Sequence, residues 1–347
     1  MNPFSYTRPH DVSTAVDELL AIEPNGNPAP AKFIAGGTNL IDLMKENVER
    51  PVKLVDINRL PLTTIEELED GGLRLGALAT NADTAYHPLV EQRYPLLSET
   101  ILAGASAQLR NMATNGGNLF QRTRCYYFYD TSMPCNKRNT GPSEGPSGCG
   151  ALGGYNRIHA ILGTEASDGN VHCIATHPSD MAVALAALDA TIRVTGPNGD
   201  RTIPIADFHR LPGDRPQQDN TLQHGEIVTA IDLPPKGFPD YHIYLKLRDR
   251  ASYAFAIVSV AAALELDGDT ITDARIALGG VAHMPWRKPE AEDLLIGKPA
   301  TKETFALAAE ALLESAQGYG HNTFKIELAK RAIVRALGQA AKLEPTE

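Results

Sequence analysis

The sequence predicts an α+β protein built in two parts, and three observations support this fold class. The stretch KFIAGGTNLIDLMKE, residues 32–46, has the pattern of an apolar strand, a glycine turn and an amphipathic helix. Residues 242–280 contain three strand-like runs, and residues 301–340 are rich in Ala and Leu with a helical period. A chain of 347 residues also exceeds one ordinary core and suggests two or three domains.

The first part alternates strands and helices. Ser13 or Thr14 is expected to cap a short helix at its start. A second helix should begin near Pro178 or Ser179, and its run MAVALAALDA is apolar nearly all round, which predicts burial. Further strands are expected at VKLVDI (52–57), LRLGAL (73–78) and TIRVTG (191–196).

The second part follows a Pro-rich stretch, Leu211–Gln218, which is expected to be a surface connection. Its strand-like runs are HIYLKLR (242–248), FAIVSVAAALEL (255–266) and ITDARIALGG (271–280). Three strands followed by helices over 301–340 predict an antiparallel sheet packed with helices.

Charge and hydropathy exclude several classes of partner. The formal net charge is −10, and no Lys/Arg stripe offsets it, so nucleic acid is not an expected partner. The first residues, MNPFSYTRPHDVST, lack an apolar core, and nowhere do 18 apolar residues follow one another. Neither a signal peptide nor membrane insertion is therefore expected. We expect a chain that is made in the cytoplasm and leaves it only folded, with a partner.

The four cysteines, Cys125, Cys135, Cys149 and Cys173, lie close together in the sequence, which indicates a shared task. Disulfides suit exported proteins, and a chain of this size needs no staples. Zinc sites usually pair their ligands at C-x2-C spacing, which is missing here. A [4Fe-4S] cluster needs four thiolates and tolerates long loops between them. The spacing favours the cluster and leaves zinc, disulfides and plain buried cysteines as alternatives.

The residues around the cysteines suit a cluster. Glycines in GPSEGPSGCG, residues 141–150, let backbone N–H groups approach sulfur. The aromatic run 126–129 is expected either to shield a cluster from water or to form a core patch. Basic side chains that can offset thiolate charge are Arg122, Arg124, Lys137 and Arg138. His172 and His177 flank Cys173 and are expected to be neighbours of the site, not ligands.

Two glycine pairs, AGGTN (35–39) and TNGGN (114–118), stand beside small polar residues. Such pairs permit unusual backbone conformations and expose N–H groups to a diphosphate. Neither pair is a G-x-G-x-x-G fingerprint or a Walker loop. Each pair alone is more typical of a tight turn than of a phosphate site.

Together, KFIAGGTNL and TNGGN resemble the FAD-binding signature of the flavoprotein subunit of molybdenum hydroxylases, the group of xanthine dehydrogenase, carbon monoxide dehydrogenase and aldehyde oxidoreductase. In that family a small-x-P-x-x-D segment follows the second glycine motif closely. Here the matching segment, ATHPSDMAVALAALDA, lies at 175–190. An insertion over about 119–174 separates the two and carries all four cysteines.

The insertion resembles two subgroups, the FAD subunit of periplasmic aldehyde oxidoreductases and that of 4-hydroxybenzoyl-CoA reductase. The patterns RTRC, YFYDT and PCNKR, with KLRDRASYAFAIVSVAA (246–262) and GGVAHMPWR (279–287), are closer to the aldehyde oxidoreductase form. The resemblance implies a two-subdomain FAD-binding domain of the vanillyl-alcohol-oxidase type over 1–220, with subdomains at about 1–58 and 59–220. It implies a carbon monoxide dehydrogenase flavoprotein-like domain over 228–340.

The resemblance also implies site residues. Asp180 would contact the ribityl or flavin region, although its place in P-S-D also suits a helix N-cap. Lys246 would lie near the flavin ring, although a lone strand lysine is usually solvated. His177 would line the flavin turn. The cysteines would hold a [4Fe-4S] cluster as its metal ligands. The FAD diphosphate would be wrapped by Lys32, Phe33, Ile34, Ala35, Gly36, Gly37, Thr38, Asn39 and Leu40, with Thr114, Gly117 and Asn118.

The implied function is electron transfer from a small [2Fe-2S] subunit through FAD to an external acceptor. A large subunit would hold the molybdenum cofactor and oxidise the aldehyde, giving a heterotrimer. The complex would be periplasmic if a partner carries a twin-arginine signal, and cytoplasmic otherwise. A stand-alone FAD enzyme and a zinc-stapled module without a redox role remain alternatives.

Overall fold

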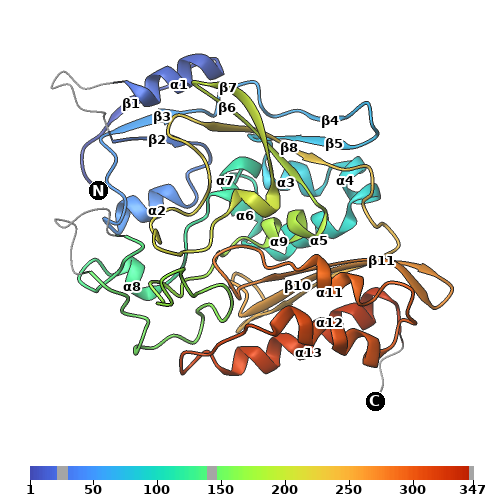
Figure 1. Cartoon of the computed structure of the whole chain (residues 1–347). Helices are drawn as coiled ribbons and strands as arrows, with labels where there is room; N and C mark the ends of the chain where they lie inside the picture. The colour runs from blue at the N-terminus through green and yellow to red at the C-terminus, as the bar shows by residue number, and fades with distance from the viewer. Residues whose placement is uncertain (22–29, 139–146, 344–347) are drawn as a thin grey trace.

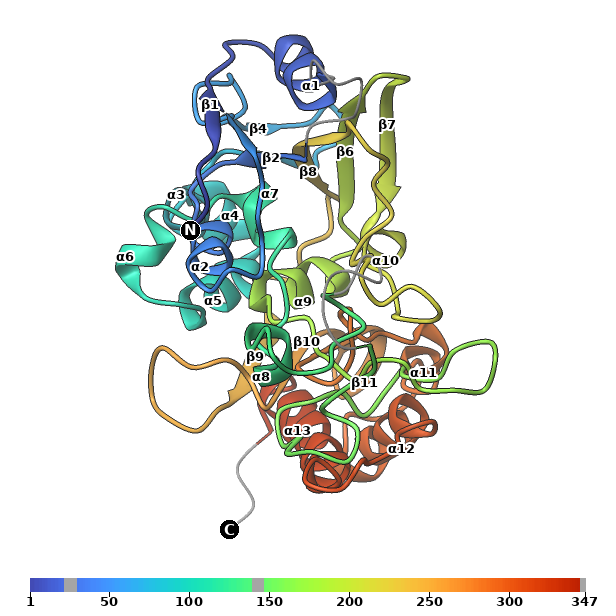
Figure 2. The same ribbon diagram turned by 90° about the vertical axis from the view of Figure 1, so that its left-hand side faces the viewer.

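A computed structural model of the chain describes residues 1–21, 30–138 and 147–343 (Figure 1). In these ranges the strands form one small parallel sheet and two antiparallel sheets. Figure 2 shows the N-terminal elements at one end of the molecule, the C-terminal helices at the other, and α7 and α9 between them.

The first sheet has the order β1-β3-β2 with parallel neighbours: Ser5–Thr7, Lys53–Asp56 and Ala31–Ile34. Helix α1, Val12–Leu20, packs its buried Ala15 and Val16 near this sheet. The cap of α1 is Asp11, whose carboxylate accepts the Thr14 N–H at 2.8 Å. The prediction of Ser13 or Thr14 as the cap is therefore wrong, because the helix is capped two to three residues earlier. Helix α2, Leu40–Lys45, follows the first glycine turn.

The second sheet has five antiparallel strands in the order β4-β5-β8-β6-β7. Its outer strands are short or exposed, while β8 in the centre is largely buried. The strands are Ile65–Glu67, Leu73–Gly76, Ile227–Leu233, Thr191–Gly196 and Gly199–Pro204. Helices in this part of the chain are α3 Asn81–Ala85, α4 Pro88–Arg93, α5 Pro95–Ala103, α6 Ala107–Arg110, α7 Asn115–Leu119 and α10 Ile205–Phe208. Helix α8, Tyr126–Tyr129, lies among the cysteines instead.

Helix α9, Asp180–Ala187, lies in the interior of the molecule. All of its residues from Met181 to Ala187 are buried, as the apolar run predicts. Its N-cap is Ser179, whose hydroxyl accepts the Ala182 N–H at 2.9 Å. Asp180 is therefore the first helical residue, and the alternative role of N-cap does not apply to it.

The third sheet, β9-β10-β11, is antiparallel and buried on both faces. Side chains of β10 alternate between two cores: Val260 faces the C-terminal helices, whereas Ala261 faces the core that contains α9. Burial on both faces explains why the run is almost continuously apolar. The elements are β9 Tyr241–Leu247, β10 Val258–Asp267, β11 Thr270–Gly279, α11 Pro289–Asp293, α12 Lys302–Leu313 and α13 Phe324–Ala340.

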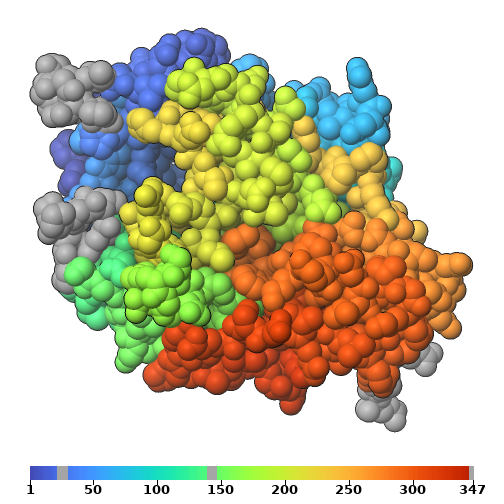
Figure 3. All heavy atoms as spheres, viewed as in Figure 1, coloured from blue at the N-terminus to red at the C-terminus, as the bar shows by residue number. Residues whose placement is uncertain are grey.

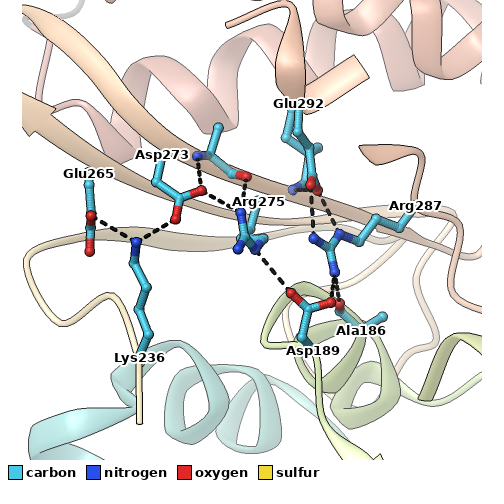
Figure 4. A network of polar contacts seen from close by, with 10 residues as sticks. Ala186, Asp189, Lys236, Glu265, Asp273, Arg275, Arg287 and Glu292 are labelled. Atoms are coloured by element: carbon cyan, nitrogen blue, oxygen red, sulfur yellow. Dashed lines mark hydrogen bonds and ion pairs between the residues drawn. The ribbon is translucent and has the colours of Figure 1, made fainter. Parts of the chain in front are cut away.

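Charged side chains join the third sheet to the end of α9 (Figure 4). Arg275 on β11 donates to the carboxylate of Asp189 at 3.2 Å, and Arg287 contacts the same carboxylate. Arg287 also holds Glu292 with two hydrogen bonds of 2.7 and 2.9 Å. The paired charges fix the C-terminal part against α9 without leaving a buried cation alone.

The cysteine-bearing segment lies against the C-terminal helices, as the green and red atoms show at the lower left of Figure 3. Hydrogen bonds support this contact, for example from the Asn322 side chain to the Ala160 carbonyl at 2.8 Å. None of the described helices is both long and apolar enough to cross a bilayer.

Candidate functional site

A cavity of about 1230 Å³ opens between the first glycine turn, α7, the start of α9 and β9. This volume is larger than an ordinary small-molecule pocket and suits a dinucleotide. Every residue that the sequence assigned to FAD lines the cavity except Phe33 and Ile34. Both lie in β2, where Phe33 packs into a small core with Ala15 and Val16. Their side chains therefore support the strand behind the turn.

The first glycine turn requires glycine for two separate reasons. A Cβ on Gly36 would lie 1.7 Å from the Met112 carbonyl oxygen, so no side chain fits there. Gly37 has a φ of +72°, a left-handed conformation that other residues adopt at a cost. Because Met112 leads into TNGGN, the close approach at Gly36 sets the two glycine motifs side by side.

The second glycine motif is the start of helix α7, not a simple turn. Thr114 caps the helix by accepting the Gly117 N–H at 3.2 Å. Both atoms of the Asn118 side-chain amide make hydrogen bonds: the nitrogen donates to the Asn81 side chain at 2.7 Å, and the oxygen accepts from the Ser179 hydroxyl at 2.6 Å. Asn118 thus joins α7 to the cap of α9 at the wall of the cavity.

Asp180 and Lys246 form a buried ion pair at the cavity wall. The Lys246 ammonium donates to Asp180 at 2.7 Å, and the two side chains are 4% and 11% exposed. The ammonium also donates to the Ala103 carbonyl at 3.2 Å. Tyr244 donates its hydroxyl to the other Asp180 oxygen, and burial with the nearby Asp180 charge raises the Tyr244 pKa well above its usual value. Lys246 is therefore not a solvated surface lysine.

A chain of opposite charges runs from the cavity to the cysteine segment. It consists of Lys32, Glu49, Arg122, Asp219 and Lys137 in alternating sign. Arg122 donates to Glu49 at 2.7 Å and to Asp219 at 2.8 Å, so its charge is already neutralised. Sequence reasoning missed Glu49 and Asp219, since neither stands in a motif and both meet Arg122 only through the fold.

The expected cationic environment of the cysteines is therefore only partly correct. Arg122 pairs with carboxylates, and Arg124 contacts Asp42 at 3.3 Å and the Tyr129 hydroxyl at 2.6 Å. Lys137 lowers the pKa of Cys173 by its charge, against the larger effects of hydrogen bonding and burial. Arg138 acts in the same sense on Cys135. Three of the four predicted cations thus pair with carboxylates, because Lys137 also contacts Asp219, whereas Arg138 donates to the Tyr127 carbonyl at 2.7 Å.

The four cysteines gather in one region although 48 positions separate the first from the last, which is 173 minus 125. Cys125, Cys135 and Cys173 are buried around Phe128, and Cys149 pairs with Cys135 through a β-bridge. The Cys149 and Cys173 side chains share a hydrogen bond, which lowers the pKa of Cys149 and, with burial, raises that of Cys173. Burial raises the pKa of Cys125 to about 12. All four are free thiols, so the disulfide alternative does not hold in this structure.

Backbone N–H groups near each sulfur act to lower the pKa of the thiol. The donors are Tyr127 and Phe128 to Cys125, Lys137 and Arg138 to Cys135, Ala151, Leu152 and Ile174 to Cys149, and Ala175 to Cys173. None of these donors is a glycine. Of the glycines expected to do this work, Gly141 and Gly145 lie outside the described residues.

Three histidines are neighbours of the cysteines in the sequence or in the fold. His159 Nε2 lies 3.1 Å from the sulfur of Cys125, a contact that no sequence motif predicts. His177 lines the cavity, and its ring lies 4.2 Å from that of His209 between centroids, tilted by 48°. Burial lowers the pKa of His177 well below the usual value. His172 pairs with Asp168 at the surface, 3.0 Å away. Within the described ranges, no three His, Cys, Asp or Glu side chains are arranged to hold a single metal ion.

The aromatic run combines both expected roles. Phe128 is fully buried among the cysteines, whereas Tyr126 is 50% exposed above them. Arg122 lies over the Phe128 ring at 4.8 Å from its centroid. The run is therefore a core patch on one side and a solvent-facing cover on the other.

Comparison with known proteins decides the family. Residues 2–236 match the FAD binding domain in molybdopterin dehydrogenase, and residues 243–340 match the CO dehydrogenase flavoprotein C-terminal domain. The chain belongs to the FAD-binding subunits of the molybdenum hydroxylase family. This confirms the resemblance drawn from KFIAGGTNL and TNGGN.

Individual relatives agree with this assignment. The flavoprotein subunit is 48% identical to the aldehyde oxidoreductase FAD-binding subunit PaoB of Escherichia coli K12, over 98% of this chain and 99% of that protein. It is 28% identical to the carbon monoxide dehydrogenase medium chain of Hydrogenophaga pseudoflava, over 97% of this chain and 96% of that one. These relatives are oxidoreductase subunits.

A solved structure confirms the α+β fold class. In the carbon monoxide dehydrogenase from Hydrogenophaga pseudoflava that lacks the Mo-pyranopterin moiety, one chain matches with a TM-score of 0.72 at 26% identity, covering 98% of this chain and 97% of that one. The third sheet and its helices thus belong to a known flavoprotein architecture.

Proposed function

We propose that this chain is the FAD and [4Fe-4S] electron-transfer subunit of a molybdenum-dependent aldehyde oxidoreductase. It would pass electrons from a [2Fe-2S] subunit through FAD to an external acceptor. The observation that carries the proposal is the convergence of both glycine motifs and the Asp180–Lys246 pair on one cavity. Similarity to an aldehyde oxidoreductase FAD-binding subunit along the whole chain supports the choice of reaction.

The residues of the cavity fit FAD. Gly36 admits no side chain, and the Asn39 Nδ2 is buried without a hydrogen-bond partner among the described residues, so a polar ligand atom would satisfy it. Residues 32–40 would hold the diphosphate together with Thr114, Gly117 and Asn118. When bound, FAD supplies an acceptor that takes two electrons and releases them to a further acceptor.

Asp180 and Lys246 would face the ribityl or flavin region from opposite elements of the wall. Because the pair is buried and hydrogen-bonded, its atoms are held rigidly against the cavity. The chain's own part in the reaction is to bind the cofactor, orient its reactive ring and exclude water from it.

The four cysteines would bind the [4Fe-4S] cluster. Free thiols from distant positions gather in one region, and nearby backbone N–H groups, together with the charges of Lys137 and Arg138, act to lower the pKa of the thiols. A cluster needs four thiolates at separate corners, which distinguishes it from a single ion held by close ligands. The support for the proposed cluster comes from these residues of the chain, and not from the relatives named above.

The partners follow from the family. A large subunit with the molybdenum cofactor and a small [2Fe-2S] subunit would complete a heterotrimer, which would be periplasmic if a partner carries a twin-arginine signal. Within this chain, we propose an FAD-binding part that extends through β8, since β8 pairs with β5 and β6. A C-terminal domain would follow it to about residue 340.

Anaerobic purification with co-expressed partner genes tests the proposal. We expect flavin absorption bands with a broad brown shoulder, and co-purifying large and small subunits. A Cys135→Ser variant should lose iron while it keeps FAD. A colourless, zinc-containing protein without partners would contradict the proposal.

A further inference from the structure

We propose that His159 donates an N–H···S hydrogen bond to Cys125, and that Lys325 is the positioning residue that holds His159 in place. The pair would set the reduction potential of the group bound by the cysteines. This inference rests on the proposed [4Fe-4S] cluster and concerns residues that lie outside both glycine motifs.

The His159 ring is placed to donate. It is 1% exposed, and its Nε2 lies 3.1 Å from the Cys125 sulfur. Tyr126 and Tyr127 pack near the ring at 6.5 and 6.4 Å between centroids. A thiolate bound to iron only accepts hydrogen bonds, so the ring nitrogen that faces it must carry the proton.

Lys325 fixes the backbone of His159 from helix α13. Its side chain is fully buried, and its ammonium donates to the His159 carbonyl at 2.8 Å, to the Ile158 carbonyl at 3.4 Å and to the Gly280 carbonyl. No carboxylate lies within ion-pair distance of it among the described residues. Burying an ammonium costs free energy unless its N–H groups find acceptors. The Lys325 N–H groups therefore hold these three carbonyls firmly in place.

The neighbouring contacts make this a clamp between two parts of the molecule. Asn322 donates to the Ala160 carbonyl at 2.8 Å, and the Gln317 N–H donates to the Ile161 carbonyl at 2.7 Å. Gly280, the third acceptor of Lys325, lines the large cavity. One buried ammonium therefore contacts the cavity wall and the residue that touches Cys125.

Hydrogen bonds to cluster sulfurs are among the factors that set the reduction potential, because they stabilise the more negatively charged reduced state. Loss of the His159 donor should lower the potential. Without this donor, we expect the equilibrium constant for reduction of the cluster to fall about tenfold, which corresponds to a shift of about 59 mV in the potential of a one-electron couple. Loss of Lys325 should shift the potential in the same direction by less, since the ring would remain but would be less well aligned.

The test is a redox titration of the purified complex, followed by the electron paramagnetic resonance signal of the reduced cluster, with iron and flavin content measured in parallel. The variants are His159→Phe, which keeps an aromatic ring without N–H, and Lys325→Met. Lys330→Met is the matched control, because Lys330 lies on the same helix and pairs with Glu310 at 2.8 Å on the surface. Lys325→Arg should keep the cluster potential closer to that of the unaltered protein than Lys325→Met does, because it retains the buried donor.

We expect His159→Phe to keep its iron and to titrate at a lower potential, with the flavin potential and the control unchanged. An unmoved cluster potential in His159→Phe with full iron content would overturn this inference and leave the proposed function intact. Absence of iron from the unaltered protein would contradict the proposed cluster itself. If Lys325→Met does not fold, His159→Phe alone decides.

Discussion

Asp180 at the start of α9 and Lys246 on β9 form an ion pair of 2.7 Å, although they are 66 residues apart in sequence. The pair joins the FAD-binding part of the chain to the third sheet at the cavity wall. It also neutralises the Lys246 charge locally, so the cavity faces a dipole here and not a bare cation. The expected influence of Lys246 on a flavin therefore depends on Asp180.

Removal of one partner should be costly. In Asp180→Asn the Lys246 ammonium stays buried without a counter-ion, and we expect a loss of about 3 kcal/mol in the free energy of unfolding. Asp42→Asn is the control, because Asp42 is 57% exposed beside Arg124 and its pair should contribute less than about 1 kcal/mol. Urea unfolding of both variants measures the difference. Equal losses would show that the pair is not effectively buried.

Gly36→Ala should abolish tight FAD retention. The added Cβ would collide with the Met112 carbonyl, which forces the two glycine motifs apart. Gly338→Ala makes the same chemical change in α13, where nothing lies within 4 Å of the new Cβ, and should leave FAD content unchanged. Flavin released by heating, per mole of chain, is the readout, with circular dichroism to verify folding. Full flavin content in Gly36→Ala would argue against a diphosphate site at this turn.

Local sequence patterns predicted most of the fold and the two glycine motifs. β6 begins and ends as expected at Thr191 and Gly196, and α9 is buried as its apolar run requires. TNGGN is the start of a helix because Thr114 caps it, a role that the glycine pair concealed. Strands and helices can be predicted in this way because the spacing of apolar residues shows which face of a strand or side of a helix is buried.

Residues that meet only in the folded chain escaped prediction. Asp219 is 97 positions from Arg122, and His159 is 34 positions from Cys125, and neither stands in a recognisable motif. Arg122 was expected to face thiolates, but the fold brings Glu49 and Asp219 closer to it. Long-range pairing of single charges leaves no periodic trace in a sequence.

Acid should weaken the molecule through Asp219. Burial opposes ionisation of this carboxyl, but the charges of Lys137 and Arg122 outweigh burial and hold its pKa well below the usual range. Because the pKa of Asp219 is lower in the folded protein than in the unfolded chain, the unfolded chain binds the carboxyl proton more tightly. The stabilisation by ionised Asp219 is therefore fully present above about pH 4 and is lost as the pH falls below that value. We expect the melting temperature to drop between about pH 4 and pH 3.

Asp219→Asn should be less stable than the unaltered protein at pH 7, and the gap should narrow below about pH 4. Asp214→Asn changes an exposed carboxylate and should follow the unaltered protein throughout. A difference in stability that stays constant with pH would show that folding does not change the pKa of Asp219.

In iron-free protein, Cys149 should react first with iodoacetamide. The hydrogen bond from Cys173 lowers the Cys149 pKa, and Cys149 is the most exposed of the four, whereas burial raises the Cys125 pKa to about 12. Cys173→Ala should slow the reaction by removing that hydrogen bond. Mass spectrometry of timed samples gives the order of modification. Earlier labelling of Cys125 would contradict the arrangement of the sulfurs.

The most direct measurement is the content of flavin, iron and acid-labile sulfide in anaerobically purified complex, for the unaltered chain and for Cys135→Ser. We expect stoichiometric FAD in both proteins, and iron matched by sulfide only in the unaltered one. A chain that carries neither flavin nor iron, or one in which Cys135→Ser keeps all of its iron, would contradict the central claim that one subunit holds both redox groups.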